Sequence, residues 1–214
     1  DVMTLSHELG HGIHQVLAAK QGEILAPTPL IIAETASVFG EMLTFERILK
    51  DEKNHSQRKY LLASKIEDMI NTVIRQISFY DFEYRVHEKR KNGELTTESI
   101  SKIWMDVSKE SLGDSFIYDE RYESFWSYVP HFIHSPFYVY AYAFGDGMVN
   151  ALYSTYRSGM SDFAKEYLNL LSAGGSKPHK ELLSPFNLDL SKKTFWLKGI
   201  QVLKDLVDEL DSLG

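Results

Sequence analysis

The stretch SHELGHGIHQ, residues 6–15, lies close to the first residue of the chain and carries two histidines four positions apart. Apolar residues recur around it with a period near 3.6: Leu5, Leu9, Ile13, Val16 and Leu17. Because this period is that of an α-helix and no proline interrupts it, the pattern predicts a helix over residues 4–19. Thr4 or Ser6 is the expected N-cap.

The spacing of the two histidines suits one metal ion. Four helical positions correspond to about 400° of rotation, so His7 and His11 lie on one side of the helix, about 6 Å apart along its axis. Glu8 lies about 100° around from His7, where its carboxylate can take a proton from a water molecule at the metal. His-Glu-x-x-His in this order is the pattern of zinc peptidases.

Two other interpretations of the motif need no metal. A solvated polar helix face would have the same appearance. The motif could also be a chance arrangement in a purely structural helical protein. From the residue frequencies of the chain, such an arrangement is expected about 0.02 times in a chain of this length. The helical context and the low chance frequency favour the metal site.

A catalytic zinc site needs a third protein ligand and leaves its fourth position to water. In one class of zinc peptidases, a glycine and a third histidine follow the second histidine by three and six positions, but His14 and Leu17 occupy those places here. The other solution is a glutamate on a following helix. The segment AETASVFGEMLTFE offers three: Glu34, Glu41 and Glu46.

Glu34 leaves enough chain for the first helix to end and for a proline-containing loop to turn back. Glu34 and Glu41 are seven residues apart and share a helix face. One of them could bind the metal while the other accepts a hydrogen bond from a ligand histidine. An ordinary exposed glutamate is the alternative for Glu41. We expect His14 beside the site or on the surface rather than among the ligands.

The composition narrows the class of protein. The chain has 214 residues, of which 43% are hydrophobic and 13% aromatic, so it can form one sizeable core or two small ones. It has no cysteine, so a transition-metal site must use histidine and carboxylate ligands. A net charge of -7 opposes binding to nucleic acid or anionic membranes. No apolar run is long enough to span a membrane and no export signal is visible, so we expect a cytoplasmic protein.

The rest of the sequence predicts helices and no convincing strand or repeat. Thr96 or Thr97 is the expected N-cap, and Gly113 the expected C-cap, of one of these helices. Residues 116–132 are aromatic and irregular, so we expect a loop or short turns there. The expected helices are residues 31–50, 56–91, 96–112, 136–158, 162–172 and 193–213. The predicted fold class is all-α, with little or no sheet.

Further segments extend the motif into a family resemblance. They are ETASVFGE, FEYRVHEKRKNGELT, PHFIHSPFYVYAYAFG, LLSAGGSKPHKELL and FWLKGIQVLKDLVDEL. Together with HELGHGIHQ, they resemble the zinc oligopeptidases that include thimet oligopeptidase and oligoendopeptidase F, most closely the second branch. The resemblance covers essentially the whole chain. It implies a helical, gluzincin-like catalytic domain that holds one Zn²⁺ and hydrolyses peptide bonds in short oligopeptides.

The resemblance also implies roles for individual residues. The zinc ligands are then His7, His11 and Glu34, and Glu8 is the general base. The residues that stabilise the tetrahedral intermediate are then His131, Tyr138 and Tyr142, because its anionic oxygen needs hydrogen-bond donors. His134 could replace His131 in this role. The resemblance gives His87 no mechanistic role, and we expect it to make structural hydrogen bonds.

In this family the metal-binding helix lies far along a longer polypeptide. Residues 1–214 are therefore expected to be the C-terminal part of a catalytic domain, without its N-terminal region. A helical surface that packs against the missing half would be exposed, which favours self-association or binding of an N-terminal half. The alternative function is a folded metal-binding fragment that is inactive without that half.

Overall fold

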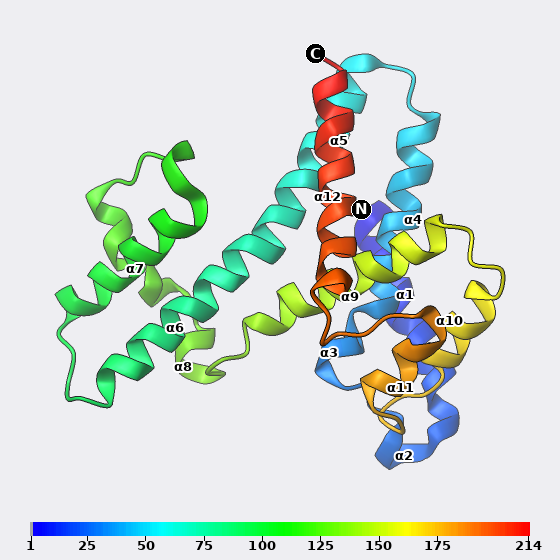
Figure 1. Cartoon of the computed structure of the whole chain (residues 1–214), viewed down its shortest axis with the longest axis horizontal. Coiled ribbons are helices and arrows are strands. Elements are labelled where there is room, and N and C mark those ends of the chain that lie inside the picture. Colours follow the sequence, from blue (N-terminus) through cyan, green and yellow to red (C-terminus); the bar gives the residue numbers. More distant parts are fainter. Residues whose placement is uncertain (1) are drawn as a thin grey trace. The chain divides into compact units, whose positions relative to one another are not determined.

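The computed structural model describes residues 2–214 and contains helices but no strand over that range (Figure 1). The all-α prediction is therefore confirmed. None of the helices in the described part of the chain is long and apolar enough to cross a membrane. The chain divides into two compact units, one made of residues 1–69 and 144–214 and the other of residues 70–143. Each unit buries an apolar core of its own.

The first unit contains the metal-binding motif and most of the helices. Its longer helices are α1 (Val2–Ala18), α4 (Thr35–Asp51), α5 (His55–Ile70), α9 (Tyr140–Arg157), α10 (Phe163–Leu171) and α12 (Lys193–Ser212). The last residue of α5 and the first four residues of α9 belong to the other unit. Its short elements are η1 (Ala19–Gln21), α2 (Gly22–Leu25), α3 (Leu30–Ala33), α11 (His179–Leu183) and η5 (Ser184–Phe186). Helices α4, α5 and α12 lie side by side (Figure 1) and share an apolar cluster around Phe45, Leu49 and Leu62.

Helix α1 packs lengthwise on α4, and a glycine permits the close approach. A Cβ atom added to Gly10 would lie 2.5 Å from the Cα atom of Ser37 and 2.6 Å from the carbonyl oxygen of Ala36. One turn earlier, the hydroxyl groups of Ser6 and Thr44 are 2.9 Å apart. Ser6 therefore faces α4 within a helix that already includes Val2, and the predicted N-cap at Thr4 or Ser6 is wrong.

The apolar stripe that predicted α1 does not form its buried face. The buried residues of α1 are Gly10, His14 and Ala18. Leu9 and Val16 in the stripe keep 57% and 76% of their surface exposed, and Leu5 and Ile13 are also exposed. The outward side of α1 is therefore an apolar strip within the first unit.

The second unit is built around aromatic side chains. Its elements are η2 (Asn71–Arg75), α6 (Gln76–Arg90), α7 (Thr97–Leu112), η3 (Gly113–Ser115), η4 (Glu120–Tyr128) and α8 (His131–His134). The core residues are Phe79, Phe82, Ile103, Trp104, Val107 and Val139. The predicted caps of α7 are confirmed, because the Thr96 side chain accepts a hydrogen bond from the Ser99 N–H and Gly113 ends the helix with φ 60°. The predicted short turns within residues 116–132 are also found, as η4 and the start of α8.

Three predicted helices differ from the structure. The helix expected over residues 31–50 is divided at Glu34 into α3 and α4. The helix expected over residues 56–91 is divided by the π-helical turn η2. The helix expected from Pro136 begins only at Tyr140, because Phe137 has a left-handed backbone with φ 61°. The N–H of Phe137 donates a 2.9 Å hydrogen bond to the Glu83 carboxylate, which stabilises this turn. Tyr138 consequently precedes the helix that carries Tyr142.

Candidate metal centre

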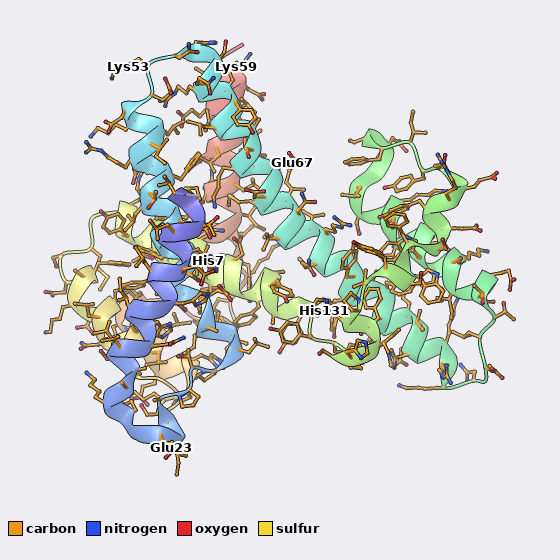
Figure 2. All side chains as sticks on the ribbon, turned by 180° about the vertical axis from the view of Figure 1, so that it is seen from behind. His7, Glu23, Lys53, Lys59, Glu67 and His131 are labelled. Atoms are coloured by element: carbon orange, nitrogen blue, oxygen red, sulfur yellow. The ribbon has the colours of Figure 1, made fainter. Side chains whose placement is uncertain are left out.

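Two helices of the first unit bring three ligand atoms together. His7 and His11 project from α1, where Figure 2 marks His7, and Glu34 lies at the junction of α3 and α4. The Nε2 atoms of the two histidines are 3.0 Å apart. The Glu34 Oε2 atom lies 3.5 Å from the first of these nitrogens and 3.4 Å from the second. All three side chains are partly exposed, so a ligand could reach them.

These separations fit a zinc ion. Ligand atoms at 2.0–2.1 Å from zinc, at the corners of a tetrahedron, lie about 3.3 Å from one another. The three observed separations span 3.0–3.5 Å. Within residues 2–214, this is also the one group of three or more His, Asp and Glu side chains that converges in this way. The donor set of two imidazoles and one carboxylate is that of known catalytic zinc sites.

Glu41 orients the first ligand. Its Oε1 atom lies 2.5 Å from Nδ1 of His7, as predicted for a carboxylate behind a ligand histidine. A hydrogen bond donated by Nδ1 to this carboxylate leaves Nε2 of His7 for a metal. Ser37 acts similarly on Glu34, since its hydroxyl donates to the Oε2 atom at 2.7 Å. These two hydrogen bonds orient the Glu34 carboxylate and the His7 imidazole.

Glu8 and His14, the other two ionisable residues of the motif, differ in burial. Glu8 is exposed on α1, one position after His7. His14 is 2% exposed, so the surface position considered for it is wrong. It makes a backbone hydrogen bond with Ala33, and burial lowers its pKa. Its Nε2 atom has no hydrogen-bond partner among residues 2–214.

The predicted oxyanion residues form a cluster within the second unit. The His131 Nε2 atom and the Tyr142 hydroxyl are 3.3 Å apart. The Tyr138 ring stacks on His131 at 5.5 Å and meets the Tyr142 ring edge-on at 5.3 Å between ring centres. His134, the alternative to His131, is exposed. The structure thus brings the three residues together, and Figure 2 marks His131 on α8.

Glu83 was not predicted, although it holds the turn beside this cluster. Its side chain is buried on α6, and burial raises its pKa while the nearby His87 and His131 lower it. The His87 ring contacts the Phe137 ring at 4.9 Å between centres. A glutamate next to the core residue Phe82 was the only signal in the sequence that this side chain could be buried.

Comparisons with known proteins find similar sequences and similar structures. The sequence model of Peptidase family M3 matches residues 1–202. The whole chain aligns with 36% of an oligoendopeptidase F homolog from Borreliella burgdorferi at 32% identity, and with 32% of the oligopeptidase PepF of Bacillus subtilis at 30% identity. The crystal structure of oligoendopeptidase-F from Enterococcus faecium superposes with a TM-score of 0.84 at 26% identity, over 99% of this chain and 38% of that chain. The chain thus spans about a third of the length of these relatives.

Proposed function

The chain belongs to Peptidase family M3, and from this membership we propose that it carries the metal centre of a zinc-dependent endopeptidase that cleaves short oligopeptides. The convergence of His7, His11 and Glu34 is the observation that carries the proposal. The names of the relatives, oligoendopeptidase and oligopeptidase, support the substrate class. Partly exposed ligands suit a centre that must admit a peptide.

The proposed chemistry assigns separate tasks to the ligands and to Glu8. Bound zinc lowers the pKa of a water molecule and polarises the scissile carbonyl. Glu8 accepts the proton of the attacking water on its carboxylate and later gives it to the leaving amine. Its position next to His7 on α1 and its exposure to solvent are compatible with this transfer.

The second-unit cluster supplies hydrogen-bond donors in this proposal. The attack places negative charge on the carbonyl oxygen, and donors fixed in advance stabilise that charge. Tyr142 and Tyr138 donate through their hydroxyl groups, and His131 donates through a ring N–H. The contacts among these three side chains favour a fixed arrangement of the donors.

A fluorogenic-peptide assay on zinc-loaded protein tests this function. Glu8→Gln should reduce kcat about 100-fold or more, because a general base typically contributes 10²–10⁴-fold. Glu67→Gln, a change of an exposed glutamate on α5 marked in Figure 2, is the matched control and should leave kcat unchanged. Equal cleavage by wild-type protein and Glu8→Gln would contradict the proposal.

A second candidate function is a metal-binding fragment that is inactive alone. It is favoured by the coverage of about a third of the relatives and by the exposed apolar strip on α1. Stoichiometric zinc binding without turnover would support it, whereas turnover by the purified chain would reject it. We also propose that the metal is zinc and that the protein is cytoplasmic. Metal analysis of protein purified from cells tests the first proposal, and cell fractionation tests the second.

A further inference from the structure

A buried lysine lies behind the metal centre, on the far side of Glu41. The Nζ atom of Lys65 is 3.5 Å from Glu41 Oε2, while Glu41 Oε1 contacts His7. The Lys65 side chain comes from α5 and is only 9% exposed. Lysine is rarely buried unless its charge is paired. The burial of Lys65 therefore indicates that its ammonium group interacts with the carboxylate that orients His7.

A second carboxylate, that of Asp146, is influenced by the charge of the same ammonium group. Asp146 on α9 is 7% exposed, and its Oδ2 atom accepts a 2.7 Å hydrogen bond from the Asn150 side chain. Burial raises the pKa of Asp146 to about 6, the charge of Lys65 lowers it, and the charge of Glu41 raises it again. The charge of Lys65 therefore acts on both carboxylates, whereas the charges of Glu41 and Asp146 oppose each other. All of these residues belong to the first unit.

The geometry of Glu41 explains what the lysine can do. Each of its two oxygens has a different partner, His7 for one and Lys65 for the other, so rotation of the carboxylate would break both contacts. A Glu41 carboxylate held in this way keeps its Oε1 atom against Nδ1 of His7 and leaves Nε2 of His7 for a metal.

We propose that Lys65 is a positioning residue of the metal centre, which tightens zinc binding by holding Glu41 against His7. This inference rests on the proposed zinc site but not on peptide hydrolysis. It predicts that the effect of Lys65 on the metal passes through Glu41. A lysine that only fills space between α4, α5 and α9 would affect folding and leave the metal affinity unchanged.

Zinc affinity of the full chain, measured by competition with a chromophoric chelator at pH 7.5, tests the inference. Removal of an outer partner of a ligand histidine typically weakens metal binding 10–100-fold, so we expect about 10-fold from Glu41→Gln and from Lys65→Met. Lys65→Arg should stay within about threefold of wild type, because it keeps the charge. The double variant Glu41→Gln/Lys65→Met should bind no more weakly than Glu41→Gln alone.

Lys53→Met, on an exposed lysine marked in Figure 2, is the control for loss of one positive charge. If Lys65→Met does not fold, the same change is measured against Asp146→Asn as the parent, in which the opposing carboxylate is already neutral. Wild-type zinc affinity in Lys65→Met, or fully additive losses of zinc affinity in the double variant, would overturn the inference about Lys65 and leave the proposed function intact. Wild-type protein that binds no zinc would contradict both the inference and the proposed function.

Discussion

At the scale of single residues, Tyr142 is the sharpest test of the second-unit cluster. Its hydroxyl lies 3.3 Å from His131 Nε2. Tyr142→Phe removes that donor and keeps the ring, so kcat for a fluorogenic peptide should fall about 100-fold, as for loss of one oxyanion donor. Zinc affinity should not change. Tyr140→Phe, on an exposed tyrosine that packs against Tyr80, is the control, and equal kcat values for the two variants would remove Tyr142 from the mechanism.

Asp146 makes folding stability depend on pH. Its pKa is about 6 in the folded protein and 3.8 when unperturbed, so the folded state binds its proton more tightly. This stabilisation is complete below about pH 4 and is lost as the pH rises through 6, a change of about 3 kcal/mol. Asp146→Asn cannot titrate, so its free energy of unfolding relative to wild type should rise over pH 4–7.

Urea unfolding of zinc-free protein at several pH values measures this difference. The other carboxyl groups contribute equally to the pH dependence of both proteins, so their contributions cancel in the difference. The groups that act on Asp146, namely Lys65, Glu41 and Asn150, are unchanged in the variant. A difference that does not vary with pH would show that Asp146 is not held protonated by burial.

The sequence revealed some of the important residues and not others. Helix periodicity is enough to place His7 and His11 on one side of a helix with Glu8 beside them. It left Glu34 as one of three candidate glutamates, which chain length and the family resemblance singled out. Lys65 and Glu83 could not be predicted in this way, because their partners are 24 and 54 residues away along the chain. Their roles depend on how helices pack, which neither periodicity nor spacing determines.

At the scale of elements, the contact between α1 and α4 depends on Gly10. Gly10→Ala places a methyl group 2.5 Å from the backbone of Ser37, so α1 must move away from α4. Since α1 carries two ligands and α4 carries Glu41, we expect weaker zinc binding. The free energy of unfolding should fall by about 1–3 kcal/mol, as at other overpacked sites.

Gly12→Ala is the matched control on the same helix. A Cβ atom at Gly12 meets nothing within 4 Å, and alanine favours helix over glycine by about 1 kcal/mol. This variant should therefore be slightly more stable and bind zinc like wild type. Similar free energies of unfolding and similar zinc affinities for the two variants, measured by urea unfolding and chelator competition, would contradict the role of Gly10 in this helix contact.

The ends of helices could be predicted where residues next to the helix determine them. The caps of α7 are set by residues adjacent to the helix, and both were predicted correctly. The start of α9 was predicted at Pro136, a reasonable first helical residue, but the helix begins at Tyr140. The carboxylate of Glu83 stabilises a left-handed Phe137 in between. A contact across 54 residues therefore overrides the local preference.

The amount of hydrophobic sequence allowed one core or two. Residues 2–214 form two compact units, each with its own core, and the first unit has a further small apolar cluster around Phe45, Leu49 and Leu62. Composition could not decide between these, because it does not indicate which segments pack together. It also could not indicate which apolar residues stay exposed. The strip on α1, formed by Leu5, Leu9, Ile13 and Val16, follows the helical period as closely as a buried face does.

The exposed strip predicts self-association of the isolated chain. Leu9→Glu/Ile13→Glu places two charges on it, which should lower the oligomer content seen by light scattering at increasing protein concentration. The free energy of unfolding of the monomer should change little, because both side chains are already more than half exposed. Exchange of exposed Ile24 on α2 for Glu is the control. Unchanged association in the double variant would exclude this strip as the contact surface.

The central claim is that His7, His11 and Glu34 hold one zinc ion. Diffraction from zinc-soaked crystals, recorded on both sides of the zinc absorption edge, tests it directly. We predict one anomalous peak per chain, about 2.0–2.2 Å from both histidine Nε2 atoms and the Glu34 carboxylate. A peak at other residues, or no peak at this site in zinc-loaded protein, would contradict the account.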